Sequence, residues 1–243
     1  MQPRWSKKTD ELVRQIAEGC QPSLQSELGA WIQSGPRFAD FVAAHRDKIR
    51  KKFATAGDRE VRLDVRAELL VAHLVLGDRR FDVAFEAAGA PRGGPDLSLR
   101  YRTNQSINLE VTRLRSSADP STLASVVATK VRQLTSGVPN GLTVVGQQLG
   151  ITEDVLADAV KHVKTRAEAR DDPFFARRGL RDARDFYTHF LRLSSVFVLD
   201  ESSASVHLAN RQTRHPIPDE ALGRLCACLG IMAAVPNTPR TPA

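Results

Sequence analysis

Apolar residues in the first third of the chain recur at helical spacing. A short helix is predicted from Thr9, a suitable N-cap, to Gly19. A longer helix follows the break at Gly35 and Pro36, and it ends in a basic cluster that we interpret as a solvated helix end. The cluster consists of Lys48, Arg50, Lys51 and Lys52. A further helix, closed by Gly77, has an apolar stripe formed by Val65, Leu69, Ala72, His73 and Leu76.

The hydrophobic period then changes from helical to alternating. Residues 81–85, 97–101 and 107–111 alternate apolar with polar or small side chains, which predicts three short strands in an antiparallel meander. The turn-rich segments 90–95 and 103–106 separate them.

Helices and strands alternate in the rest of the chain. We expect helices at about 121–134, 152–169, 180–193 and from Asp219 onwards, and strands at 142–145, 196–198 and 206–208. This order predicts an α/β sandwich. We divide the chain into a helical N-terminal extension at 1–56, a core at 57–235 and a flexible tail at 236–243.

The strands at 97–101 and 107–111 bring two acidic residues together. If their apolar residues share a face, Leu99 pairs with Leu109 and Leu97 with Val111, across a loop of odd length. Asp96 and Glu110 then become diagonal neighbours on the other face, about 7 to 8 Å apart. Two carboxylates at this separation can share one divalent metal ion. A solvated pair of strand-edge charges is the structural alternative.

These residues carry a resemblance to a known superfamily. Pro95-Asp96, an interval of thirteen residues and Glu110-Val111-Thr112, after a helix bearing Glu68, resemble the PD-(D/E)XK nuclease superfamily over roughly residues 60–150. The resemblance implies a restriction-endonuclease-like three-layer core, α-β-β-β-α-β, with a central mixed sheet. It also implies a magnesium- or manganese-dependent endonuclease or exonuclease acting on DNA or RNA.

The resemblance assigns a role to each site residue. Asp96, Glu110 and the carbonyl of Val111 would be metal ligands, and Glu68 an accessory carboxylate. Thr112 departs from the pattern, because it replaces a lysine that would orient or deprotonate the attacking water. Lys130 on the following helix is similar to the displaced lysine of some superfamily members, although an exposed helix lysine explains it equally well.

The charge of the chain agrees with a polyanionic partner. Lysine and arginine number 35 against 28 acidic residues, a formal net charge of +7, which favours nucleic acid as a partner. Of the two nucleic acids, we expect DNA in preference to RNA. The arginines expected to contact its backbone, unless they pair with carboxylates, are Arg100, Arg102, Arg113 and Arg132.

Two other functions are open. Thr112 favours a catalytically inactive nuclease fold that binds nucleic acid or protein, and residues 144–163 resemble a helix-turn-helix, which would make the chain a DNA-binding regulator. The three cysteines form no CxxC pair, and no signal peptide or membrane-length apolar run is found. We therefore expect a cytoplasmic protein that does not contact a membrane, with the extension available for homodimerisation.

Overall fold

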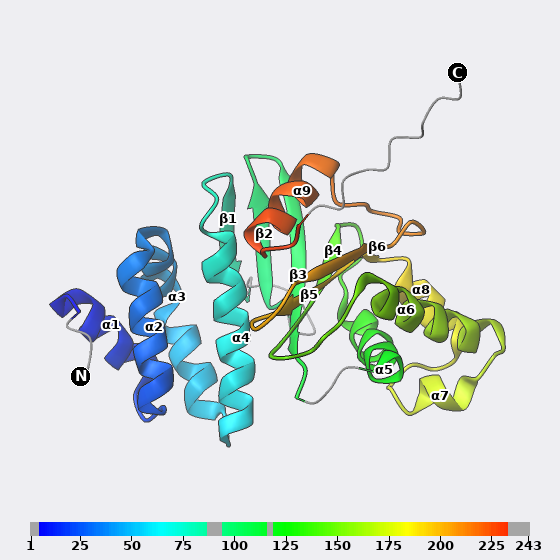
Figure 1. Ribbon diagram of the computed structural model, residues 1–243, viewed down its shortest axis with the longest axis horizontal. Helices are drawn as coiled ribbons and strands as arrows, with labels where there is room; N and C mark the ends of the chain where they lie inside the picture. Colours follow the sequence, from blue (N-terminus) through cyan, green and yellow to red (C-terminus); the bar gives the residue numbers. More distant parts are fainter. Residues whose placement is uncertain (1–4, 87–93, 116–118, 233–243) are drawn as a thin grey trace.

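A mixed β-sheet lies at the centre of the computed structural model, which describes residues 5–86, 94–115 and 119–232 (Figure 1). Within these residues the sheet has six strands in the order β1-β2-β3-β4-β5-β6. β1 to β3 are antiparallel, β4 and β5 continue parallel to β3, and β6 is antiparallel to β5. The strands are β1 (Phe81–Phe85), β2 (Leu97–Tyr101), β3 (Gln105–Arg113), β4 (Asn140–Gly146), β5 (Leu193–Asp200) and β6 (Val206–Ala209).

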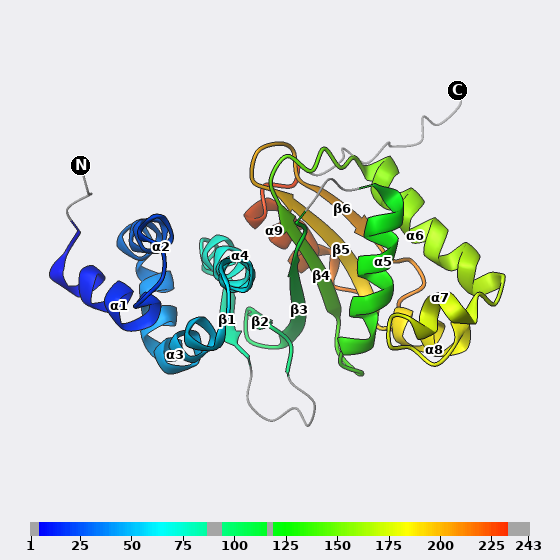
Figure 2. The same cartoon turned by 90° about the horizontal axis from the view of Figure 1, so that it is seen from below.

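Helices cover both faces of this sheet (Figure 2). One side carries α1 (Lys7–Ala17), α2 (Pro22–Ser34), α3 (Pro36–Thr55), α4 (Arg59–Val75) and α9 (Asp219–Cys228). The other carries α5 (Pro120–Lys130), a 3₁₀ turn (Val131–Gln133), α6 (Glu153–Glu168), α7 (Asp172–Ala176) and α8 (Ala183–Phe190). The predicted α/β class with a mixed sheet is confirmed.

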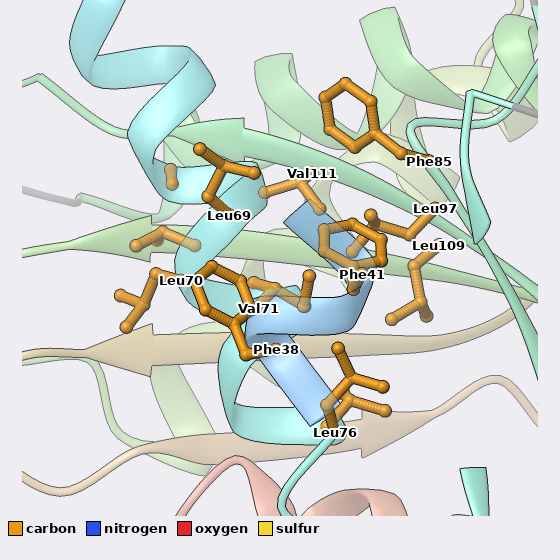
Figure 3. Packing of buried hydrophobic residues seen from close by; sticks show 14 of the residues in the cluster. Phe38, Phe41, Leu69, Leu70, Val71, Leu76, Phe85, Leu97, Leu109 and Val111 are labelled. Carbon is orange, nitrogen blue, oxygen red and sulfur yellow. The ribbon is translucent and has the colours of Figure 1, made fainter. Parts of the chain in front are cut away.

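Each face of the sheet packs its own hydrophobic core. Figure 3 shows the first core, where Phe41 of α3, Leu69 of α4 and Phe85 of β1 surround apolar residues of β2 and β3. The second core lies between β4, β5 and helices α5, α6 and α8. β4 and β5 are buried along their whole length, because helices cover both of their faces.

Of the first three helices, α3 packs directly on the sheet, and α1 and α2 pack on α3. α3 runs along the outer edge of β1, where edge strands otherwise present unpaired backbone groups. Lys48 Nζ donates to the carbonyl of Phe85 at 3.2 Å, Arg37 donates to the carbonyl of Phe81, and His45 Nε2 accepts from the amide of Phe85 at 3.5 Å. Side chains of α3 therefore satisfy part of the edge of β1.

The predicted register of β2 and β3 is wrong by two residues. Leu97 pairs with Leu109 and Leu99 with Ile107. A shift of two residues leaves each side chain on the same face, so the hydrophobic pattern fits both registers equally well. Loop length makes the choice: Tyr101 pairs with Gln105, which leaves a three-residue turn in which Arg102 has a φ of 54°.

Other predictions have mixed outcomes. The helix that a helix-turn-helix needs before Gly150 is absent, because β4 ends at Gly146 and α6 begins only at Glu153. The sequence did not predict α7. Residues 90–93 of the expected turn and the expected tail at 236–243 lie outside the described residues. Among the described helices, none is long and apolar enough to cross a membrane.

Candidate functional site

Three acidic residues come together where α4 crosses the sheet. Glu68 lies on α4, Asp96 immediately precedes β2, and Glu110 lies in the middle of β3. Because Leu97 pairs with Leu109, Asp96 and Glu110 occupy opposite positions and not the predicted diagonal ones. The amide of Val111 donates to Asp96 Oδ2 at 2.8 Å, which fixes this carboxylate against β3.

A lysine that the sequence analysis missed lies among these carboxylates. The ammonium of Lys52, on α3, is 2.6 Å from Glu68 Oε2, 3.8 Å from Asp96 Oδ1 and 3.0 Å from Glu86 Oε1. It also lies 5.0 Å from the centroid of the Phe85 ring. The site thus contains a fourth carboxylate, Glu86, and a cation from the segment predicted as an extension.

The interpretation of the basic cluster as a solvated helix end is wrong for two of its members. Arg50 and Lys51 are exposed, whereas Lys48 and Lys52 turn toward β1. Positions four residues apart share one helix face, and His45 lies on the same face. The shared face of His45, Lys48 and Lys52 could have been noticed in the sequence. It indicates contact with the sheet only once α3 is known to pack along β1.

Backbone geometry places Glu86 beside the other carboxylates. Its φ is 43°, a conformation that is uncommon for a residue other than glycine. The amide of Glu86 donates to the carbonyl of Asp96 at 3.0 Å, and the carbonyl of Glu86 accepts from Lys48 Nζ at 2.6 Å. Such conformations cluster at functional sites, where surrounding contacts hold them.

Burial and mutual repulsion raise the pKa of two of the carboxyl groups. Burial, followed by the charge of Asp96, raises the pKa of Glu68 to about 8, although Lys52 opposes the shift. The same two causes raise the pKa of Glu110 to about 8. For Lys52 burial lowers the pKa, but Glu68, Asp96 and Glu86 outweigh burial, so the net shift is upward. The site therefore holds more potential negative charge than its lysine neutralises.

Lys130, the lysine predicted from sequence, approaches from the other side of the sheet. It is the last residue of α5 and half-buried, and its charge lowers the pKa of Glu110. Thr112 lies two residues beyond Glu110 on β3 and is also half-buried. The positive charges of Lys130 and Lys52 thus both act to lower the pKa of Glu110, although the two lysines lie on helices on opposite sides of the sheet.

The arginines predicted to bind nucleic acid lie on several different elements. Arg100 pairs with Asp82 of β1, Arg102 with Glu220 of α9, and Arg113 with Asp64 and Glu60 of α4. The guanidinium of Arg132 packs against Gly179. Among the described residues, none of these four arginines forms an ion pair with Glu68, Asp96 or Glu110.

The donor set is suited to a hard divalent cation, although it is not closed around one. Carboxylate oxygens are the ligands that Mg²⁺ and Mn²⁺ prefer. Within residues 5–86, 94–115 and 119–232, no three His, Cys, Asp or Glu side chains are already arranged to hold a metal ion. The Lys52 ammonium lies among the same carboxylates, within 3.8 Å of Glu68, Glu86 and Asp96. A metal ion would have to share or take over contacts that Lys52 now makes.

Comparison of the chain with protein-family models, curated proteins and solved structures gives no match.

Proposed function

We propose that the protein is a metal-dependent nuclease that hydrolyses DNA or RNA phosphodiesters. The observation that carries this proposal is the proximity of Glu68 on α4, Asp96 just before β2 and Glu110 on β3, since the charges of Asp96 and Glu68 both raise the pKa of Glu110. The strand order supports it: α4, three antiparallel strands, α5 and a strand parallel to β3 follow each other as in the PD-(D/E)XK superfamily. Fold and carboxylates thus agree with the resemblance found in the sequence.

The charge balance supports a divalent metal ion, Mg²⁺ or Mn²⁺. Burial and the charge of Asp96 raise the pKa of both Glu68 and Glu110, so their ionised forms are costly without a cation, and a metal ion would favour those forms. Asp96, Glu110 and the carbonyl of Val111 would hold the metal, with Glu68 beside them. When bound, the metal would polarise the scissile phosphate and lower the pKa of the attacking water.

Lys52 is the best substitute for the lysine that Thr112 replaces. A threonine hydroxyl is neutral, so it cannot supply the charge of an ammonium group. Lys52 already contacts Glu68 at 2.6 Å, and Glu86 holds its ammonium from another direction. From this position it would donate a hydrogen bond to a phosphate oxygen or to the attacking water. Lys130 remains the alternative, acting on Glu110 from α5.

Cleavage assays with matched variants test the proposal. Labelled single- and double-stranded DNA and RNA would be incubated with Mg²⁺ or Mn²⁺ and with wild type, Glu110→Ala, Lys52→Ala or Lys130→Ala. We expect metal-dependent cutting that Glu110→Ala abolishes and that Lys52→Ala reduces by about 10²-fold or more, as for the loss of a group that moves or orients a proton. Lys161→Ala, an exposed lysine of α6, should cut normally. A greater loss in Lys130→Ala than in Lys52→Ala would assign the role to Lys130.

Metal binding can be tested without substrate. A metal ion that binds only the folded chain, and whose free concentration is 100 times its Kd, raises the unfolding free energy by about 2.7 kcal/mol. We expect this stabilisation in wild type and not in Asp96→Ala. Because protons on Glu68 and Glu110 compete with the metal, the apparent affinity should rise between pH 6 and pH 8.5. A folded wild type with neither stabilisation by metal nor cleavage would contradict the proposal.

A second function follows from the position of Lys52. If its ammonium is a permanent counter-ion, the chain is an inactive nuclease fold that binds nucleic acid or a protein partner. In that case Mg²⁺ would not stabilise wild type. Lys52→Ala should lower the unfolding free energy under either function, because removing one partner of a buried ion pair typically costs about 3 to 5 kcal/mol. The presence or absence of stabilisation by Mg²⁺ in wild type therefore separates the two functions.

A further inference from the structure

A second group of basic residues lines an open pocket of about 560 Å³ between α5, α6 and the segment around α7. Its cationic side chains are Arg166, Arg177 and Arg178, and Ser121, Ser125 and Thr129 of α5 line the facing wall. His162 and Phe174 complete the lining, and none of these eight residues is acidic. The helices that form the pocket cover the face of the sheet opposite to α3 and α4 (Figure 2).

Arg178 is held in place by several contacts. Its guanidinium lies 3.6 Å from the centroid of the Phe174 ring and donates to Ser125 Oγ at 2.7 Å and to the carbonyl of Phe174 at 2.8 Å. Its Nε is buried and has no hydrogen-bond partner among the residues that the structure describes. Arg178 is therefore a fixed cation whose donors are not all used.

Positive charge is concentrated around the same phenyl ring. The guanidinium of Arg166 lies 4.7 Å from the centroid of Phe174. It donates to His162 Nε2 at 2.9 Å and pairs with Asp171 at 2.5 Å. Asp171 thus offsets one of the three arginine charges. Burial and the charges of Arg177 and Arg166 lower the pKa of Arg178, which agrees with net repulsion among them.

We propose that this pocket binds a phosphoryl group. Guanidinium groups match the geometry of phosphate oxygens and bind them through paired hydrogen bonds. The site does not depend on a helix N-terminus, because Asp119 already accepts hydrogen bonds from the first free amides of α5, those of Ser121 and Thr122. The proposal shares no residue with the nuclease site and stands independently of it.

The pocket favours recognition of the phosphate and not of a base. Two guanidinium groups lie within 5 Å of the centroid of Phe174, the phenyl ring of the lining, so little of this ring is left for a base to stack on. Arg177 is exposed, and its Nε donates to the Pro173 carbonyl of its own turn at 3.2 Å. Its terminal nitrogens can therefore reach a ligand without breaking the packing of the pocket.

Titration calorimetry in metal-free buffer tests the proposal with three probes: inorganic phosphate, adenosine monophosphate and a short single-stranded DNA. We expect Arg177→Gln and Arg166→Gln to weaken binding by about tenfold or more each, as for the loss of a charged hydrogen bond. Arg211→Gln, which removes an exposed arginine after β6, should bind as wild type does. Because Arg177 is exposed, its substitution should leave the fold intact.

The three probes distinguish the source of the phosphoryl group. Binding of phosphate and monophosphate that both variants weaken assigns the pocket to a small phosphorylated ligand. Binding of the oligonucleotide alone, weakened by both variants, assigns it to a nucleic-acid backbone. The proposal fails if no probe binds wild type, or if both variants bind every probe as tightly as wild type does.

Discussion

The charge of Glu110 gives a sharp test of the electrostatics of the site. Its side chain is buried, and its pKa is raised from an ordinary value of 4.5 to about 8. Glu110→Gln replaces the carboxyl group with a neutral amide of nearly the same shape. The variant therefore removes the ionisation while it disturbs the packing of β3 little.

The size and sign of the effect follow from proton linkage. In the unfolded chain Glu110 loses its proton near its ordinary pKa of 4.5, whereas in the folded protein it keeps the proton until about pH 8. Between these values the folded state binds the extra proton, so the unfolding free energy falls as the pH rises, by about 1.4 kcal/mol per pH unit. From pH 5 to pH 7 wild type should lose about 3 kcal/mol through this residue. Glu110→Gln cannot lose this contribution, because its amide does not ionise.

Urea unfolding between pH 5 and pH 8, in the presence of a chelator, measures the effect. We expect the stability of Glu110→Gln relative to wild type to increase by about 3 kcal/mol from pH 5 to pH 7. Glu18→Gln, an exposed position after α1, should show no such trend. A difference between Glu110→Gln and wild type that stays constant with pH would refute the reasoning. Saturating Mg²⁺ should raise the unfolding free energy of wild type and not that of Glu110→Gln, because only wild type keeps the proposed ligand.

Two other predictions concern the fold. Arg66 of α4 is buried and pairs with Glu27 of α2 and with Glu201 after β5. In urea titrations Arg66→Met should therefore lower the unfolding free energy by about 3 kcal/mol or more. Arg14→Gln, which breaks an exposed pair, should change it by less than about 1 kcal/mol. A Cβ on Gly141 would lie 2.6 Å from Leu109 Cδ2. Thermal unfolding should therefore show that Gly141→Ala is less stable than wild type by about 1 to 3 kcal/mol. Equal stability of Gly141→Ala and wild type would contradict this.

Much of the fold could be predicted from sequence because its periods are clear. Residues 81–85 and 97–101 alternate and became β1 and β2, and the uninterrupted apolar run at 142–145 became part of the buried strand β4. The shared apolar face of β2 and β3 was also predicted correctly, since Leu97, Leu99 and Leu109 are all buried in one core. Local pattern therefore determined which elements form and which faces they bury.

Strand register and lysine placement depend on information that a local pattern does not carry. Two registers of β2 against β3 bury the same residues, and only the conformation of the turn at Arg102 separates them. Lys52 presented a similar ambiguity, because a basic residue in the last turn of a helix interacts well with solvent and with the helix dipole. Its contact with Glu68 depends on how α3 packs along β1, which is a tertiary property.

The same packing makes α3 part of the site. A helix that only extended the core could be removed without changing the charge around Asp96. Here α3 supplies Lys52 to the carboxylates, and through Lys48 it bonds the carbonyl of Glu86, which lies beside them. A lysine on β3 would keep its place through strand pairing alone, whereas Lys52 keeps it only while α3 stays docked. We therefore expect the charge balance of the site, and with it any metal binding, to depend on the docking of α3.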